Sequence, residues 1–354
     1  MHTTTLPQPQ LNYRDIVENV TSKSINALNR KAQLPNDAVA SAARAYTEWK
    51  RISNDLNAKR NARAAMGERI RRSNSDVERK EAIFNASALK AEMKELEMTL
   101  DKVEQQCLHF ALPIPNDTHP KVPLGPESAA VLISKHGPFQ RSVDPKRDHL
   151  RICRHFGLVD FESASNVTGN SWYFLRNEAA MLELALTNFA IMIALRHGYT
   201  LVTTPDVVRS DIAVRCGFNP RDNSNPPVSH MYHLSSTSRL SPELVLSGTS
   251  EVPLAGMVAN KIYSSTDLPL RFVGVGRAFR AEAGARSVDT RGLYRVHQFT
   301  KVELFAVTAE DASEDMMEEM LSIQKYILEE LGLSFRFNLC FHILSSLGSD
   351  RPRP

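Results

Sequence analysis

The sequence predicts an α+β protein: an N-terminal antiparallel helical hairpin followed by an antiparallel β-sheet domain with flanking helices. Between residues 86 and 110, apolar side chains recur at alternating intervals of three and four, the pattern of a coiled-coil seam. Residues 272–305 contain two runs with strand character around a loop rich in Gly, Arg and Asp. A proline-rich stretch at 113–120 separates the two patterns. Because proline cannot continue a helix, we expect the hairpin to end before it.

Composition sets broad limits on the class of protein. The chain has 354 residues, enough for two or three domains, with 23% charged and 42% hydrophobic residues. Its four cysteines have no CxxC spacing, so the sequence indicates neither a zinc cluster nor a disulfide framework, and we expect reduced thiols. The first fifteen residues lack an apolar signal core and the Arg-rich character of an organelle presequence.

Residues 36–110 are expected to form the two long helices of the hairpin. Each has roughly 35 residues and would extend about 50 Å. Asn36 and Asp37 offer an N-cap near the start, and residues 73–76 are the expected turn. The stripe of the first helix is Val39, Ala42, Tyr46, Trp49, Ile52, Leu56, Met66 and Ile70. The seam of the second helix is Ala86, Leu89, Met93, Leu96, Leu100, Val103, Cys107 and Phe110.

Positive charge is concentrated toward the tip of this hairpin. Between Lys50 and Lys80 there are ten basic and four acidic residues, an excess of +6 in a chain whose net charge is +3. Local positive charge on an extended element is typical of a surface that binds a nucleic-acid backbone. A coiled coil that dimerises, or one with a solvated charged face, would show the same pattern.

Beyond the linker, the pattern predicts a helix from Asn177 to about His197 and then a strand. Residues 179–195 are the most apolar run, but Glu183, Thr187 and Asn188 interrupt it, so we expect a buried helix and not a membrane span. Alternation of apolar and polar residues over 334–341 predicts a final strand.

The two strands of 272–305 carry charged side chains where a core strand would be apolar. Because side chains alternate across a strand, Arg280 and Glu282 should share one face of the first strand. The second strand places Arg295, His297, Phe299, Lys301 and Glu303 on one face, and Val296, Thr300, Val302 and Leu304 on the other. Cations, carboxylates and one aromatic ring together suit a ligand with phosphate, a purine ring and an amine. An ordinary hairpin with a solvated charged face is the alternative.

Three segments resemble the seryl-tRNA synthetases among the class II aminoacyl-tRNA synthetases. FRAE followed by DTRGLYRVHQFTKVELF is similar to motif 2, HGYTLVTTPDVV to motif 1 with Pro205 as its signature proline, and IPNDTHPKVPLG to the junction between arm and catalytic domain. The resemblance implies a class II synthetase sheet domain and a serine–tRNA ligase activity. Serine would attack ATP to form seryl-adenylate, with Mg²⁺, and serine tRNA would accept the seryl group. It also implies a homodimer through the motif 1 region and no membrane partner.

The resemblance also implies roles for individual residues. Arg280 and Arg295 would be catalytic, at the α-phosphate and the distal phosphates of ATP. The ATP site would comprise Arg280, Ala281, Glu282, Arg295, Val296 and Phe299, with Glu282 on the adenine amino group and Phe299 stacked on the ring. The serine site would comprise Thr249, Ser250, Glu251 and Glu303; Thr249 and Glu251 are expected to share a strand or extended-loop face. Contacts with tRNA would come from Lys59, Arg60, Arg63, Arg69, Arg71 and Arg72. No residue is assigned to a metal.

The resemblance is expected to run from about residue 12 to residue 337. The expected division is a tRNA-binding arm at 1–115, a partial catalytic domain with motifs 1 and 2 at 116–337, and a divergent tail at 338–354. Because motif 3 is not recognised, we expect that this chain will not aminoacylate tRNA at a useful rate. A catalytically inactive synthetase-like protein that binds tRNA or a partner, and a dimeric structural coiled coil, are the alternative functions. The compartment is left between cytoplasm and mitochondrion.

Overall fold

The computed structural model divides the chain into two compact units, which are mainly residues 7–131 and 132–338. The division of function into an arm at 1–115 and a catalytic part at 116–337 remains a prediction. The structure describes residues 6–32, 34–72, 76–125, 127–138, 144–218, 231–235, 242–282 and 291–339.

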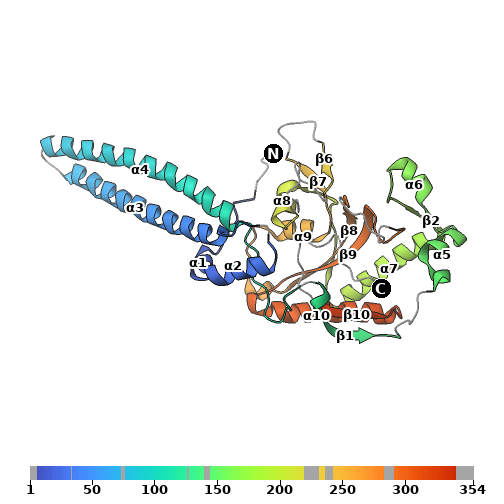
Figure 1. Cartoon of the computed structure of the whole chain (residues 1–354). Helices are drawn as coiled ribbons and strands as arrows, with labels where there is room; N and C mark the ends of the chain where they lie inside the picture. Colours follow the sequence, from blue (N-terminus) through green and yellow to red (C-terminus); the bar gives the residue numbers. More distant parts are fainter. Residues whose placement is uncertain are drawn as a thin grey trace. The chain divides into compact units, whose positions relative to one another are not determined.

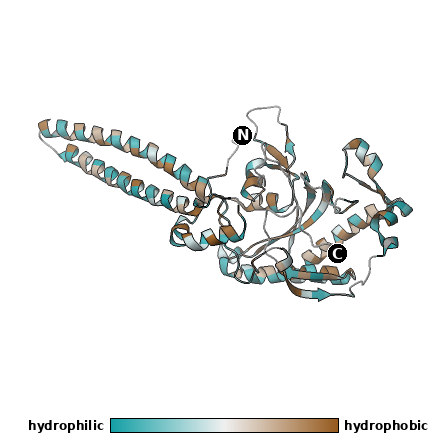
Figure 2. Ribbon diagram, in the orientation of Figure 1, coloured by the Kyte–Doolittle hydropathy of each residue, from teal (hydrophilic) through white to brown (hydrophobic). Residues whose placement is uncertain are grey.

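The first unit contains the predicted hairpin. Helices α3 (Ala38–Arg72) and α4 (Asp76–Ala111) run antiparallel along their whole length, with 35 and 36 residues (Figure 1). Hydrophobic and hydrophilic residues alternate around both helices (Figure 2). The predicted seam is confirmed, because Ile52, Val103 and Cys107 form a buried cluster with Trp49, Leu96 and Leu100 packed on it. Residues 73–75 of the turn expected at 73–76 lie outside the described residues, and Asp76 is the first residue of α4.

Two short helices, α1 (Tyr13–Glu18) and α2 (Val20–Asn29), pack at the base of the hairpin. Sequence patterns did not predict them, because neither is long enough to show a sustained period. The Asn12 side chain caps α1 by accepting a hydrogen bond from the Asp15 amide at 3.1 Å. Ile16 is then buried with Val39, Ala42 and Ala111 of the hairpin.

The second unit is built on a three-stranded sheet in the order β4 (Thr200–Thr203), β8 (Leu270–Phe279), β9 (Gln298–Val307). Strands β8 and β9 are antiparallel, as predicted, whereas β4 joins β8 in parallel, so the sheet is mixed. The β8–β9 register sets Gly274 opposite Glu303 and Gly276 opposite Lys301. In the described part of the chain, β9 has no strand on its other side.

One face of this sheet is the core of the unit. Helices α7 (Asn177–Arg196) and α10 (Ser313–Glu330) supply Ile193, Ala194 and Ile323, which are buried with Tyr199 and Val273. Val302 and Leu304 of β9 pack against this cluster, which confirms that their face is the apolar one. The charged face of the hairpin therefore points away from this core.

Helix α7 differs from the expectation of a buried helix. Ile193 and Ala194 are its only fully buried residues, while Met181 is 69% and Leu184 is 61% exposed. By length and composition alone α7 could cross a membrane. Its contacts with β8, β9 and α10 make it a packed element of this unit with one open apolar side.

Smaller elements surround the sheet. A second antiparallel sheet has the order β5-β7-β6, and β10 pairs with β1, which confirms the predicted final strand. The remaining elements are β1 (Val131–His136), α5 (His149–Phe156), β2 (Val159–Asp160), α6 (Phe161–Val167), β3 (Phe174–Leu175), β5 (Val207–Arg209), α8 (Ser210–Arg215), β6 (His233–Leu234), β7 (Leu244–Leu246), α9 (Glu251–Val258) and β10 (Phe335–Leu339).

Candidate active site and nucleic-acid interface

Two glycines of β8 allow another segment to lie directly on the charged face of the sheet. A Cβ at Gly274 would come within 2.8 Å of a Leu254 methyl carbon, and one at Gly276 within 2.7 Å of the Thr204 hydroxyl oxygen. Both contacts are closer than side-chain atoms tolerate. The absence of side chains therefore lets residues 247–250 and α9 approach the β8 backbone.

Residues 247–250 are held in a fixed position by hydrogen bonds. The Ser247 carbonyl accepts from the Phe279 amide at 2.9 Å, and the Ser247 hydroxyl donates to the Thr249 carbonyl at 2.6 Å. Thr249 is consequently only 2% exposed. Glu251 is the first residue of α9, so the expectation that Thr249 and Glu251 share a strand or extended-loop face is wrong.

Thr249, Lys301 and Glu303 form a closed group on this face. The Thr249 hydroxyl donates to Glu303 Oε2 at 2.9 Å, and Lys301 Nζ donates to the Thr249 hydroxyl at 3.0 Å. Lys301 Nζ also lies 2.5 Å from Glu303 Oε2. Lys301, which was expected on this face but was not assigned to the serine site, is therefore part of the candidate serine site.

Glu251 interacts electrostatically with Glu303 and Lys301 of this group. Loss of hydration in the folded chain, and then the neighbouring Glu303 carboxylate, raise the pKa of Glu251, while Lys301 and Arg280 act in the opposite direction. Two carboxyl groups next to one ammonium group form an environment suited to a second cation, such as the amine of an amino acid.

Ser250 is directed away from this group. Its side chain is buried and accepts a hydrogen bond from the Thr204 hydroxyl at 3.2 Å. Its place in the serine site, given by the resemblance, stays a prediction. In this structure its hydroxyl serves the packing of the loop on Gly276.

Arg280 and Phe299 meet at the end of the β8–β9 pair. Strand β8 ends at Phe279, one residue before Arg280, but the Arg280 amide still donates to the His297 carbonyl at 2.9 Å. The expectation that Arg280 and Glu282 lie within the strand is therefore wrong. Arg280 nevertheless lies on the same face as Phe299 of β9. Its guanidinium carbon lies 5.1 Å from the centre of the Phe299 ring.

Glu282 and Arg295 form an ion pair, with Arg295 Nε 2.5 Å from Glu282 Oε2. Both lie outside the strands, since β9 begins at Gln298. Glu282 has a left-handed backbone, φ 49°, which costs energy in a residue other than glycine. Of their chain neighbours, Ala281 is half-buried and Val296 is buried.

His297 is surrounded by aromatic residues that sequence patterns did not reveal. Its Nδ1 lies 2.8 Å from the Tyr232 hydroxyl and 3.0 Å from the Arg280 carbonyl. Trp172 stacks on its ring at 5.6 Å between centroids. These partners come from distant segments, so only the fold brings them together. They hold the backbone on which Arg280 is carried.

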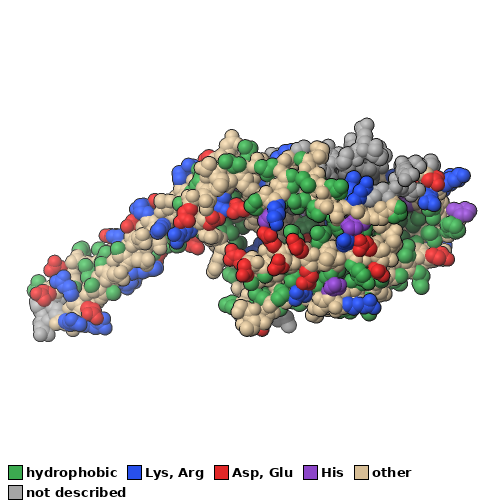
Figure 3. Space-filling view, turned by 90° about the horizontal axis from the view of Figure 1, so that it is seen from below, with side chains coloured by type: hydrophobic (Ala, Val, Ile, Leu, Met, Phe, Trp, Pro, Cys, Tyr) green, Lys and Arg blue, Asp and Glu red, His purple; other side chains and the backbone are tan. Residues whose placement is uncertain are grey.

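The six basic residues predicted to contact tRNA divide by their partners. Lys59 pairs with Glu92 and Arg60 with Glu97 across the hairpin, whereas Arg71 and Arg72 pair with Glu68. No ion pair involves Arg63 or Arg69 within the described residues. Figure 3 shows basic and acidic side chains mixed on the surface of the hairpin.

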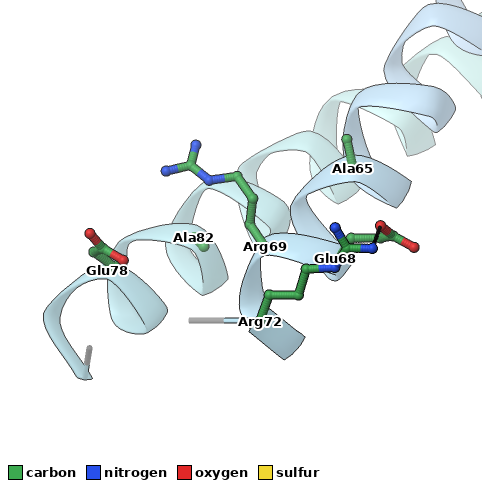
Figure 4. Close-up of a pocket in the computed structure, with 6 residues that line it drawn as sticks. All are labelled: Ala65, Glu68, Arg69, Arg72, Glu78 and Ala82. Carbon is green, nitrogen blue, oxygen red and sulfur yellow. Dashed lines mark ion pairs between the residues drawn. The ribbon is translucent and has the colours of Figure 1, made fainter. Parts of the chain in front are cut away.

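A shallow hollow of about 390 Å³ lies near the end of the hairpin, lined by Ala65, Glu68, Arg69, Arg72, Glu78 and Ala82. Arg72 is held by its ion pair with Glu68, while the Arg69 guanidinium extends away from that pair (Figure 4). The extended guanidinium is accessible to an external anion.

Comparison with known proteins places this chain in a family. The mitochondrial serine–tRNA ligase of Schizosaccharomyces pombe is 34% identical over 330 residues, covering 93% of this chain and 68% of that protein. The serine–tRNA ligase of Rubrobacter xylanophilus is 36% identical, covering 92% of this chain and 74% of its own length. The chain belongs to the serine–tRNA ligase family. These are aminoacyl-tRNA ligases, and the relatives include mitochondrial and bacterial members.

The fold agrees with this assignment to the serine–tRNA ligases. The crystal structure of seryl-tRNA synthetase from Pyrococcus horikoshii complexed with ATP superposes with a TM-score of 0.82 at 28% identity, covering 96% of this chain and 78% of that one. Residues 232–351 match the tRNA synthetase class II core domain (G, H, P, S and T). This match extends beyond residue 337, where the resemblance was expected to end.

Proposed function

We propose that this chain carries out the serine–tRNA ligase reaction. The serine carboxylate attacks the α-phosphorus of ATP to give seryl-adenylate and pyrophosphate. A ribose hydroxyl of serine tRNA then attacks the seryl carbonyl, and AMP leaves. One observation carries the proposal. The group of Thr249, Lys301 and Glu303 lies on the same sheet face as the Arg280–Phe299 contact, so an amine site and a nucleotide site adjoin.

The nucleotide end would be recognised through stacking and charge. Adenine stacks on Phe299, and the Arg280 guanidinium, now over that ring, binds the α-phosphate where charge develops during attack. Arg295 and Glu282 exchange their mutual ion pair for the distal phosphates and the adenine amino group. Ala281 and Val296 line the site mainly through their backbone. No protein nucleophile is needed, because alignment and charge stabilisation carry the reaction.

The amino-acid end would hold serine by its ammonium group at Glu303 and Glu251. A site that hydrogen-bonds the substrate's polar groups rejects analogues that lack them more strongly than an apolar site can. A partner for the serine hydroxyl at this end would distinguish serine from alanine.

Mg²⁺ is implied by the family, and the described residues do not form a site of their own for it. In this part of the chain no three or more His, Cys, Asp or Glu side chains are grouped to hold a metal ion. The Glu303 carboxylate is already engaged by Lys301 and Thr249. We therefore assign no step to the metal; Mg²⁺ would enter with the ATP phosphates.

The arm would bind serine tRNA. Basic side chains on an extended hairpin suit recognition of shape and phosphates more than of base edges.

The open side of α7 would form a homodimer interface. The exposed Met181 and Leu184 are unfavourable in water and suit burial against a second copy. A hollow of about 340 Å³ beside α7 is lined by apolar residues such as Leu186 and Val302 and also by Glu183 and Thr300.

Calorimetric titration with serine and with ATP tests the two ends of the site separately. We expect Glu303→Ala to weaken serine binding about tenfold or more while ATP binding is unchanged, and Phe299→Ala to do the reverse. Absence of binding of both ligands to the unchanged chain would contradict the proposal. Serine-dependent exchange of pyrophosphate into ATP reports the chemical step. Binding of both ligands without exchange would favour the inactive, binding-only alternative.

A further inference from the structure

The hydrogen bonds among Thr249, Lys301 and Glu303 have only one possible direction. A lysine ammonium group donates and cannot accept, so the Thr249 hydroxyl must accept from Lys301 Nζ at 3.0 Å. The single hydroxyl proton of Thr249 is then directed to Glu303 Oε2 at 2.9 Å. Glu303 Oε2 also receives Lys301 directly, at 2.5 Å.

This arrangement leaves little for Thr249 to offer a ligand. Its only proton is used on Glu303, and the residue is almost completely buried under the loop. Glu303 Oε2 already receives two hydrogen bonds, whereas Oε1 has none from these two residues. Lys301 therefore helps to set the orientation of the Glu303 carboxylate, both directly and through Thr249. The Glu251 carboxyl also forms a hydrogen bond with Glu303.

We propose that Lys301 is the positioning residue of the amino-acid site, which turns Glu303 toward the ligand and uses the Thr249 hydroxyl as a link. The ligand ammonium group is then bound by the carboxyls of Glu303 and Glu251, and Thr249 acts through Glu303. This inference rests on the proposed function for the identity of the ligand, but the hydrogen-bonded group itself is independent of it.

The charges around Lys301 explain why an ammonium group is needed there. Glu251 at the start of α9 and Glu303 on β9 bring two negative charges, and Arg280 lies beyond them. The Cys216 thiol, at the end of α8, also faces Glu251. Without the Lys301 cation, two carboxylates would face each other, and one of them would take up a proton more readily. Lys301 thus offsets part of the negative charge that Glu251 and Glu303 bring to this site.

The first test uses the ligand-free protein and thermal unfolding at about pH 5 and about pH 8. We expect Lys301→Met to lower Tm more at the higher pH. Carboxyls whose pKa is raised by removal of the cation favour folding when protonated, and this contribution disappears as pH rises through the raised value. Lys325→Met, which removes an exposed lysine of α10, is the control and should show no such pH difference. An equal decrease at both pH values for Lys301→Met would overturn the proposal.

The second test uses serine affinity by calorimetry. We expect Lys301→Met to weaken serine binding about tenfold or more, Lys301→Arg to recover part of it, and ATP binding to stay unchanged. The Lys301→Met/Thr249→Val double variant should be little worse than Lys301→Met alone, because both residues act through Glu303. Additive decreases in affinity would show that Thr249 contacts the ligand independently. Failure of the unchanged protein to bind serine would reject the proposed function, while the ligand-free test would still decide the role of Lys301.

Discussion

Arg280 is proposed to serve a ligand and not the core. Its guanidinium lies over the Phe299 ring, and its backbone continues the pairing of β8 with the segment before β9. A residue that serves a ligand contributes little to folding, so its removal separates binding from stability.

We expect Arg280→Ala to weaken ATP binding about tenfold or more and to leave Tm nearly unchanged, because the variant cannot form a charge-assisted hydrogen bond to phosphate. Calorimetry and thermal unfolding on the same samples measure the two effects. Arg336→Ala, at an exposed arginine of β10, is the matched control. Disappearance of the cooperative thermal transition in Arg280→Ala would instead show that Arg280 is a structural ion-pair partner.

Glu251 should make stability depend on pH. Loss of hydration and the neighbouring Glu303 raise its pKa in the folded chain, so it favours folding when protonated and loses that contribution as pH rises. At pH values above the raised pKa of Glu251, Glu251→Gln should therefore raise Tm relative to the unchanged protein. At acidic pH it should have little effect. Thermal unfolding as a function of pH measures this. A difference in Tm that is independent of pH would mean that the surroundings of Glu251 do not raise its pKa.

Single residues also show where sequence patterns stop being informative. Alternation correctly placed Phe299, Lys301 and Glu303 on one face of β9, because period two is a local property of a strand. It could not show that Glu251 begins a helix, since Thr-x-Glu fits a strand and a helix start equally well. Nor could it associate Trp172 with His297, because that contact depends on the fold of distant segments.

Among the helices, the hairpin was predictable and the exposure of α7 was not. A seam that repeats over many turns determines which sides of α3 and α4 meet. An apolar helix such as α7 has the same composition whether it is covered by its own chain or by a second copy. Only the packing shows that one side of α7 is open.

The hairpin should bind tRNA independently of the amino-acid site. Replacing residues 60–91 with a short Gly-Ser loop keeps the buried cluster of Ile52, Val103 and Cys107 and removes the tip. We expect tRNA binding to be abolished while serine and ATP binding persist. Filter binding or fluorescence anisotropy measures tRNA affinity. In the unchanged protein this affinity should fall steeply as salt concentration rises, because phosphate contacts release counterions.

Arg63 and Arg69 allow a finer comparison within the hairpin. Replacing both with Gln should weaken tRNA binding and make it less sensitive to salt. The slope of log K against log salt concentration should become shallower by about one unit for each phosphate that an arginine no longer neutralises. Arg51→Gln is the control, because Arg51 lies nearer the base and pairs with Glu48 and Asp55. Unchanged tRNA affinity in the tip deletion would reject the arm as the tRNA-binding element.

The open side of α7 should hold two copies together. A glutamate at Leu184 would place a charge in the proposed interface, so Leu184→Glu should convert a dimer to a monomer. Sedimentation velocity measures the change. Ile262→Glu, at a fully exposed apolar residue outside α7, is the matched control and should remain dimeric. A monomer in the unchanged protein, or a dimer in Leu184→Glu, would contradict this assignment.

Taken as one molecule, the protein is proposed to hold adenylate and serine side by side on one sheet face. The loop at 247–250, the two glycines of β8 and the end of the β8–β9 pair all contribute to that face. A stable seryl-adenylate analogue, with a sulfamoyl group in place of the phosphate, would occupy both ends at once.

Calorimetric titration with this analogue is the most direct test. We predict that it binds much more tightly than ATP or serine alone, because one molecule gains both sets of contacts without a second loss of translational freedom. Arg280→Ala and Glu303→Ala should each weaken it, and the corresponding alanyl analogue should bind more weakly to the unchanged protein. An analogue that binds no more tightly than ATP, or whose affinity is the same in Glu303→Ala, would contradict the proposal that the two sites adjoin on this face.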